Sequence, residues 1–305
     1  MSYLRGTDHL GVLLQGLLFW IWRKRGEQGN DPGCGPFIGA HPRLGLFHDL
    51  GTFLRAIMIK IEDLYKSFDG LEVLRGVSFQ VEKGEILALI GRSGDGKSVL
   101  LKHVAGLIRP DRGHVFIDGN DMCCLRGKKL EEIRRRFGFL FQSGALFDSL
   151  TVYENVAFPL REKTKLSEEQ IRKKVLDMLD QVDVIGAENK YPAEISGGMI
   201  RRAALARALV REPDIMLFDE PTTGLDPIIA HHIINLIQSC HKRLKFTGII
   251  VTHEIPKTFE IVEKVALLYE GKILTVETPA EILSSDDPIV HQFITGSIEG
   301  PVQYH

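Results

Sequence analysis

Hydrophobic and polar residues follow two different periods along the chain from Met58 onward. Val77, Phe79 and Val81 alternate with polar residues, which is typical of a strand with one solvent-exposed face. Residues 86–90 are apolar without interruption, as expected for a central strand of a parallel sheet covered on both faces. Similar apolar runs recur at 115–117, 137–141, 215–218, 249–251 and 265–269, and helical patterns fall at 167–184, 199–211 and 228–243. This order predicts an α/β domain whose ligand site lies at the carboxyl ends of the strands.

The first 57 residues have a different texture. They contain 10 of the 30 glycines and both tryptophans, and the stretch from Gly26 to Phe53 has neither the period of a strand nor that of a helix. A packed domain is therefore not expected there, and we place a boundary at about Met58. We favour an N-terminal extension (1–57) that is disordered or a wrongly assigned start. A membrane-surface or targeting segment and a small folded element stay open as alternatives.

Length and charge narrow the function classes. The chain has 305 residues, with 38 Lys and Arg against 40 Asp and Glu, and a formal net charge of −2. This balance argues against a strongly basic nucleic-acid-binding protein, and no nucleic-acid partner is expected. No apolar run reaches the roughly 18 residues that a membrane-spanning helix needs, so a role at a membrane would require partner proteins. The four cysteines form no CxxC pair, which favours reduced thiols.

A phosphate-binding loop follows directly after the apolar run 86–90. The residues are Gly91, Arg92, Ser93, Gly94, Asp95, Gly96, Lys97 and Ser98, and a helical run begins at Val99. They fit the pattern G-x-x-x-x-G-K-[ST] in the strand, loop and helix context that the motif requires. Glycines let successive N–H groups face the phosphates. Lys97 is expected to reach the β- and γ-phosphates, and the Ser98 hydroxyl to ligate Mg²⁺.

A pair of carboxylates follows another apolar strand. Residues 215–218 lead into Asp219 and Glu220, so both carboxylates are expected at the same sheet edge as the phosphate loop. Asp219 is predicted to hold Mg²⁺ through water, and Glu220 to orient or polarise the attacking water. Alone this pattern is weak evidence, but paired with the phosphate loop it predicts phosphoryl chemistry.

Between these two elements lies a third motif. Ser196, Gly197, Gly198 and Met199 precede a helix with several arginines. An ordinary Ser-capped helix would explain these residues in isolation. At this distance before the Asp-Glu strand, however, they resemble the signature motif of ATP-binding-cassette (ABC) ATPases. That resemblance implies an α/β P-loop NTPase with a mainly parallel core sheet, an antiparallel β-subdomain and an inserted helical subdomain at about 143–211.

Further positions match the same family in order along the chain. Phe68 corresponds to the aromatic residue on which adenine stacks, and Gln142 to the Q-loop glutamine that contacts Mg²⁺. Residues 224–226 resemble the D-loop, and His253 the switch histidine at the γ-phosphate. The resemblance implies ATP as the nucleotide, with Glu220 and His253 as catalytic residues. It also implies that Ser196–Gly198 face the ATP bound by a second copy of the chain.

A narrower resemblance concerns lipid transport. The last signature position, commonly Gln, is Met199, and this motif with residues 91–103, 141–160 and the tail from Asp287 is similar to the Mla-type ATPases. That group implies a homodimer bound to permease subunits and an MCE-domain protein, peripheral on the cytoplasmic face of the inner membrane, driving phospholipid transport between membranes. The domain would span 58–285. The alternatives are another ABC transporter, a soluble ABC ATPase or a small-molecule P-loop kinase.

The C-terminal tail (286–305) carries its own pattern. Asp287 and Pro288 predict a helix start, Gly296 predicts its end, and the apolar residues beyond it are too few to form a core. The resemblance implies that this tail contacts the second subunit. The alternative is that it folds back on its own chain.

Overall fold

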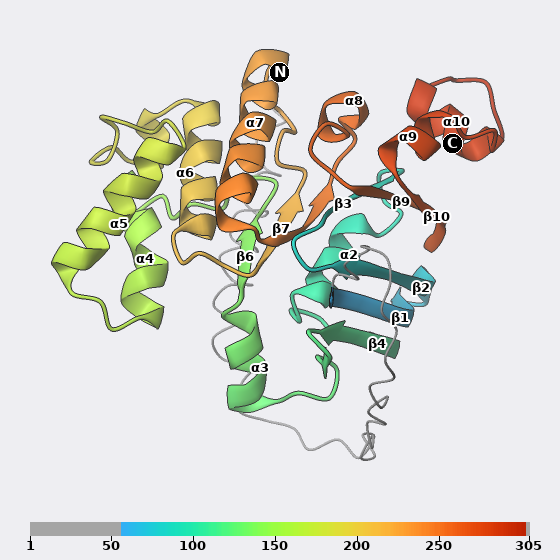
Figure 1. Ribbon diagram of the computed structural model, residues 1–305, viewed down its shortest axis with the longest axis horizontal. Coiled ribbons are helices and arrows are strands. Elements are labelled where there is room, and N and C mark those ends of the chain that lie inside the picture. The colour runs from blue at the N-terminus through green and yellow to red at the C-terminus, as the bar shows by residue number, and fades with distance from the viewer. Residues whose placement is uncertain (1–55, 303–305) are drawn as a thin grey trace, which may run out of the picture.

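The structure is a computed structural model that describes residues 56–302, apart from the side chain at position 256. The predicted extension 1–57 therefore lies almost entirely outside the described residues. Two sheets form the framework (Figure 1). One has the order β2 (Leu71–Glu82), β1 (Ile57–Phe68), β4 (Arg112–Ile117) and β5 (Asn120–Asp121). The other has the order β10 (Lys272–Glu277), β9 (Lys264–Tyr269), β3 (Ile86–Gly91), β8 (Thr247–Val251), β7 (Ile215–Asp219) and β6 (Phe137–Leu140).

Strand direction separates the two sheets. All pairs in the four-stranded sheet are antiparallel. In the six-stranded sheet only β10 and β9 are antiparallel, and the other pairs are parallel. The predicted mainly parallel core sheet with an antiparallel β-subdomain is thus confirmed.

The helices of the described residues surround the parallel sheet. They are α2 (Lys97–Val104), α3 (Gly127–Arg134), α4 (Val152–Lys163), α5 (Glu168–Gln181), α6 (Gly197–Leu209), α7 (Pro227–Leu244), α8 (Ile255–Thr258), α9 (Pro279–Leu283) and α10 (Pro288–Thr295), with a 3₁₀ turn at Pro192–Glu194. Helices α4, α5 and α6 group together beyond β6, at the left of Figure 1, and lie within the helical subdomain predicted at about 143–211. Within residues 56–302 no helix is both long and apolar enough to cross a bilayer.

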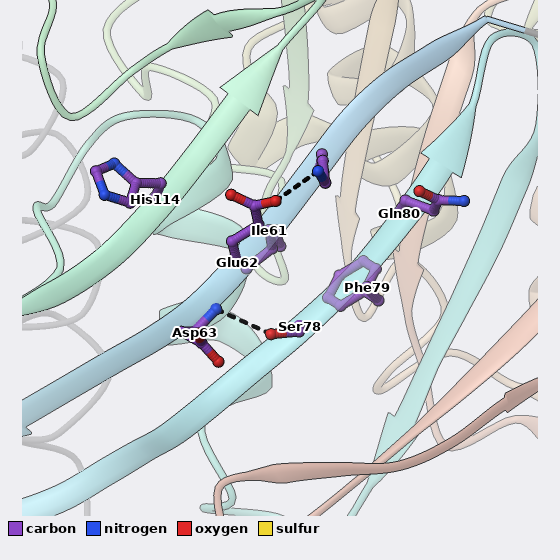
Figure 2. Close-up of a pocket in the computed structure, with 8 residues that line it drawn as sticks. Ile61, Glu62, Asp63, Ser78, Phe79, Gln80 and His114 are labelled. Carbon is purple, nitrogen blue, oxygen red and sulfur yellow. Dashed lines mark hydrogen bonds and ion pairs between the residues drawn. The ribbon is translucent and has the colours of Figure 1, made fainter. Parts of the chain in front are cut away.

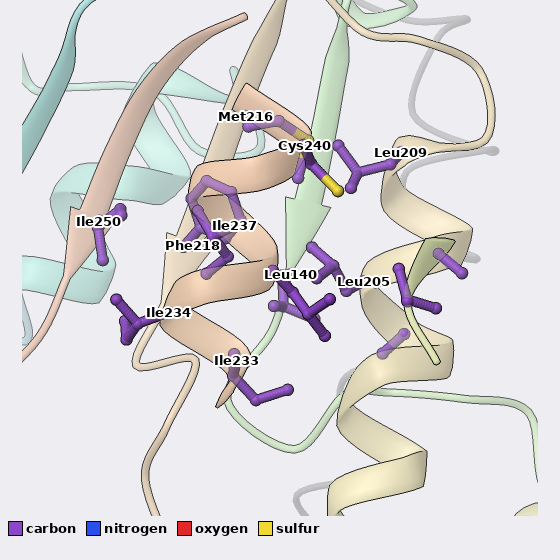
Figure 3. Close-up of a cluster of buried hydrophobic side chains, with 14 of the residues drawn as sticks. Leu140, Leu205, Leu209, Met216, Phe218, Ile233, Ile234, Ile237, Cys240 and Ile250 are labelled. Carbon is purple, nitrogen blue, oxygen red and sulfur yellow. The ribbon is translucent and has the colours of Figure 1, made fainter. Parts of the chain in front are cut away.

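The uninterrupted apolar run of β3 arises because both faces of this strand are buried, as predicted. Leu87 and Leu89 pack into one buried cluster with α2 and the antiparallel sheet, whereas Ala88 and Ile90 pack into a second cluster with the helices on the other face. Figure 3 shows part of the second cluster, where Phe218 of β7 lies among side chains of α7. A strand buried on both faces has no polar side to alternate with.

Helix ends differ from the predicted ones by one to three residues. Helix α5 stops at Gln181 rather than 184, because Asp183 adopts a left-handed φ of 55°. Helix α6 begins at Gly197 rather than 199, since Ser196 caps it and glycines carry no apolar signal.

The tail helix forms as predicted. Asp287 accepts hydrogen bonds from the backbone of residues 289 and 290, and Gly296 ends α10 with a left-handed φ of 65°. Beyond it, Val302 is only 1% exposed and bonds to the side chain of Gln292 in the same chain, while Ile298 is 91% exposed. The described tail thus packs partly on its own chain, and its contact with a second subunit stays a prediction.

Candidate nucleotide site

The phosphate loop joins the end of β3 to the start of α2. Ser93 and Gly94 lie exposed at its tip, and Gly96 caps α2 with a left-handed φ of 99°. A side chain at Gly96 would collide with Val73 of β2, since a Cβ there would lie 2.8 Å from that side chain. The loop therefore needs glycine both for its conformation and for its close approach to the antiparallel sheet.

Lys97 lies inside the loop. Its Nζ donates hydrogen bonds to the carbonyl oxygens of Gly91 at 2.8 Å and Arg92 at 2.7 Å. Burial lowers the pKa of Lys97 below its ordinary value, and nearby carboxylates, Glu220 first, oppose this shift. The cation is thus held by neutral carbonyl groups at the place where the motif expects phosphate oxygens.

Asp95 is the other ionisable residue of the loop with a shifted pKa. Burial raises the pKa of its carboxyl group, although hydrogen bonds from neighbouring backbone groups oppose the shift. Its Oδ2 is buried without a hydrogen-bond partner among the described residues. The cations Arg92 and Lys97 also oppose the shift, so burial alone raises this pKa.

Ser98 and Asp219 meet across 121 positions of sequence. The Ser98 hydroxyl donates to Asp219 Oδ1 at 2.8 Å. Burial raises the pKa of Asp219, and the hydrogen bond from Ser98 opposes this shift. A hydroxyl and a carboxylate side by side form an oxygen ligand pair of the kind that Mg²⁺ prefers. The two residues therefore fit the metal position predicted for them.

Glu220 lies at the centre of the polar contacts. Its Oε2 accepts hydrogen bonds from Gln142 Nε2 at 3.0 Å and from the Thr223 hydroxyl at 2.8 Å, and His253 Nδ1 lies 3.9 Å away. The structure thus brings Gln142 and His253 together at Glu220. In this arrangement the Gln142 amide holds the carboxylate, whereas its predicted contact with Mg²⁺ stays a prediction.

The signature residues lie at the start of α6. The Ser196 hydroxyl accepts from the Met199 backbone N–H at 3.3 Å, and Ser196 and Gly197 are exposed. Gly198 is buried, and a Cβ there would lie 2.9 Å from Ile229 of α7. Met199 is partly buried and packs against the apolar core. The described hydrogen bonds do not join Ser196 to the phosphate loop of its own chain.

Phe68 ends β1, away from the apolar core. Its side chain is 43% exposed, and Lys66 Nζ lies 5.3 Å from the ring centroid. An exposed ring at the end of the hairpin that touches the phosphate loop is available for stacking.

A hollow lies on the antiparallel sheet, lined by residues of β1, β2 and β4. Figure 2 shows its polar side chains, which include Glu62, Ser78 and His114. Its polar groups already pair with one another: Lys60 contacts Glu62 at 2.5 Å, and the Asp63 N–H donates to Ser78 at 2.9 Å. None of the predicted nucleotide residues lines it.

Two residues linked to the Glu220 site, Thr223 and Arg201, were not assigned to it by the sequence analysis. Thr223 carries no motif of its own, although its place three residues after Glu220 in a turn is a local signal. Arg201 was not distinguished from the other arginines of α6, because its partners are the backbone carbonyl groups of Phe141, Gln142 and Thr223, which the sequence does not mark.

Comparison with known proteins assigns the class. The family described as ABC transporter matches residues 74–223. The solved ATP-binding cassette MJ0796, described as a dimer in a post-hydrolysis state with ADP and Pi, has a TM-score of 0.67 and 32% identity over 73% of this chain and 99% of its own. The chain belongs to the ABC transporter family and is an ATP-binding, ATP-hydrolysing subunit.

Similar relatives narrow the group within that family. The intermembrane phospholipid transport ATP-binding protein MlaF of Haemophilus influenzae is 41% identical over 81% of this chain and 94% of its own length. Protein TRIGALACTOSYLDIACYLGLYCEROL 3 of Arabidopsis thaliana is 44% identical over 81% and 76%. The probable ribonucleotide transport ATP-binding protein mkl of Mycobacterium leprae is 44% identical over 83% and 73%. The predicted similarity to Mla-type ATPases is confirmed.

Proposed function

We propose that this chain drives phospholipid transport between two membranes as the ATPase subunit of a larger transporter. The observation that supports phospholipid as the transported substrate is the 41% identity to MlaF across 94% of that protein. In this proposal two copies of the chain bind two permease subunits and work with an MCE-domain protein. The assembly places the chain on the cytoplasmic face of the inner membrane.

The contacts around Glu220 support the reaction. Two hydrogen bonds fix its carboxylate, and an ionised carboxylate held in place can orient and polarise a water molecule. Lys97 would bind phosphate oxygens, and Ser98, Asp219 and Gln142 would hold Mg²⁺, which would neutralise part of the phosphate charge. His253 Nδ1 lies 3.9 Å from the Glu220 carboxylate, which supports the role proposed for it at the γ-phosphate.

Exposure of the signature residues supports a composite site. Ser196 and Gly197 present a helix N-terminus to solvent, and no hydrogen bond of the described residues joins it to the phosphate loop of its own chain. A second copy, related by twofold symmetry, would bring these N–H groups to the γ-phosphate of the first. ATP then joins the two copies, and hydrolysis releases them.

A second cargo is favoured by one relative. The mkl protein, described as a probable ribonucleotide transport protein, is 44% identical over 73% of its length. Both cargoes use the same ATPase chemistry, so the nucleotide site does not distinguish them. Transport by the assembly purified from membranes, with labelled phospholipid and with labelled ribonucleotide, separates the two proposals.

The test of the reaction is Glu220→Gln. The amide keeps the shape of the side chain but lacks the charge that polarises water, so turnover should fall by about 10³-fold while ATP binding is retained. The ATP-bound dimer should then persist in size-exclusion chromatography. The control is Glu212→Gln, which changes an exposed carboxylate paired with Lys174 at the surface. Near-normal turnover of Glu220→Gln would refute the role given to this residue.

A further inference from the structure

Arg201 is a buried cation whose partners are carbonyl groups. It is 8% exposed and projects from α6. Its Nη1 donates to the carbonyl oxygens of Phe141, at 3.0 Å, and Gln142, and its Nη2 donates to that of Thr223 at 3.1 Å. Among residues 56–302 it forms no ion pair, and burial lowers its pKa. A buried charge without a counter-charge costs stability, so its retention calls for a positional reason.

The identity of these partners suggests that reason. Gln142 and Thr223 are the two residues whose side chains donate to Glu220 Oε2, at 3.0 and 2.8 Å. They are far apart in sequence, one after β6 and the other after β7. One guanidinium therefore binds the backbone of both residues that hold the catalytic carboxylate.

We propose that Arg201 is a positioning residue for Glu220. The planar guanidinium has five N–H donors in a fixed arrangement, so it sets the distance between the two backbone segments. Without the guanidinium, each backbone segment can shift, and the two hydrogen bonds to Glu220 are no longer held at fixed lengths and angles. The proposal rests on the role of Glu220 given above.

Arg207 provides a matched comparison on the same helix. The residue as a whole is half-buried, and burial of its guanidinium group lowers its pKa to about 10. It donates to the carbonyl oxygens of Ala145 at 2.7 Å and Gly144 at 2.8 Å, in the same loop as Gln142. It is hydrogen-bonded to neither of the residues that hold Glu220. Loss of either arginine removes a guanidinium charge and leaves carbonyl groups without donors, but only the loss of Arg201 should disturb the carboxylate of Glu220.

The experiment compares Arg201→Met with Arg207→Met in the full chain. We expect Arg201→Met to lower kcat by about 10- to 100-fold with KM for ATP changed less than about threefold, because a small misplacement of a catalytic group affects the chemical step. Arg207→Met should keep kcat within about threefold of the wild type although both variants lose thermal stability. Equal losses of kcat in the two variants would show a merely structural role and overturn the proposal.

Two further variants keep the test decisive if Arg201→Met does not fold. Arg201→Lys retains the charge but not the planar arrangement, so kcat should still fall; wild-type kcat would overturn the proposal. Thr223→Val removes one donor to Glu220, and its effect should be less than additive with that of Arg201→Lys because both act on one network. Strict additivity would argue against the proposal. If Glu220→Gln itself hydrolyses ATP normally, the proposed function fails first, whatever the arginine variants show.

Discussion

Gln292 holds the C-terminal tail to the body of the protein, and its replacement by leucine tests this attachment. It lies in α10, is 3% exposed, and uses its whole amide group. Its Nε2 donates to the carbonyl oxygens of Ser297 at 3.2 Å and Val302 at 3.0 Å, and its Oε1 accepts from the Val302 N–H at 2.8 Å. Gln292→Leu keeps the size of the side chain and removes all three hydrogen bonds.

The magnitude follows from these contacts. Three hydrogen bonds at about 1 kcal/mol each give about 3 kcal/mol, and both backbone groups of Val302 would otherwise stay buried without partners. A tail at the end of the chain can instead swing into water, so this free energy is lost from tail docking and not from global folding. At 1.4 kcal/mol per factor of ten, the population of the undocked tail should rise by roughly 100-fold.

Hydrogen exchange of the Val302 amide is the direct assay. In Gln292→Leu this amide should exchange roughly 100-fold faster while amides of the buried strand β3 keep their rates. His291→Ala is the matched control, because His291 is exposed on the same helix and its side chain has no described bond to the tail. An unchanged Val302 rate would refute the reasoning, as would equal acceleration in β3.

Two further predictions concern α2. Lys97→Ala removes the cation that is predicted to contact phosphate, so ATP affinity measured by calorimetry should fall by about 10- to 100-fold, and unchanged affinity would contradict the phosphate-loop assignment. Burial lowers the pKa of His103 from 6.5 to about 4. The unfolded state therefore binds more protons between these values, and stability falls as pH decreases through this window. Between pH 7 and pH 5 the free energy of unfolding, measured with urea, should fall by about 2 kcal/mol because of His103. In His103→Leu this contribution to the pH dependence should be absent. An equal decrease in the wild type and the variant would contradict the prediction.

Motifs that are local in sequence could be predicted almost completely. The phosphate loop needs only a strand, a glycine-rich turn and a helix start, all of which lie within residues 86–104. The meeting of Ser98 with Asp219 spans 121 positions, yet it could be predicted because carboxyl ends of parallel strands share one edge. Topology supplies the long-range information in that case.

Contacts between side chains and backbone carbonyl groups could not be predicted. Every residue has a carbonyl group, so nothing in the sequence indicates that Arg201 binds those of Gln142 and Thr223. Gln292 shows the same limit, since a glutamine in an amphipathic helix is typical of the solvent-exposed face. Its burial depends on a tail that returns after Gly296 to cover it.

The position of Glu220 depends on where the sheet ladder ends. Asp219 is the last residue of β7 and pairs with Val251 of β8, and the next N–H, that of Glu220, still donates to the Val251 carbonyl at 3.0 Å. Glu220 then adopts a left-handed φ of 49°, which costs about 1–2 kcal/mol for a residue with a side chain. This turn separates the directions of the two carboxylates. Asp219 contacts Ser98, whereas Glu220 contacts Gln142 and Thr223, so adjacent residues can serve metal binding and water activation separately.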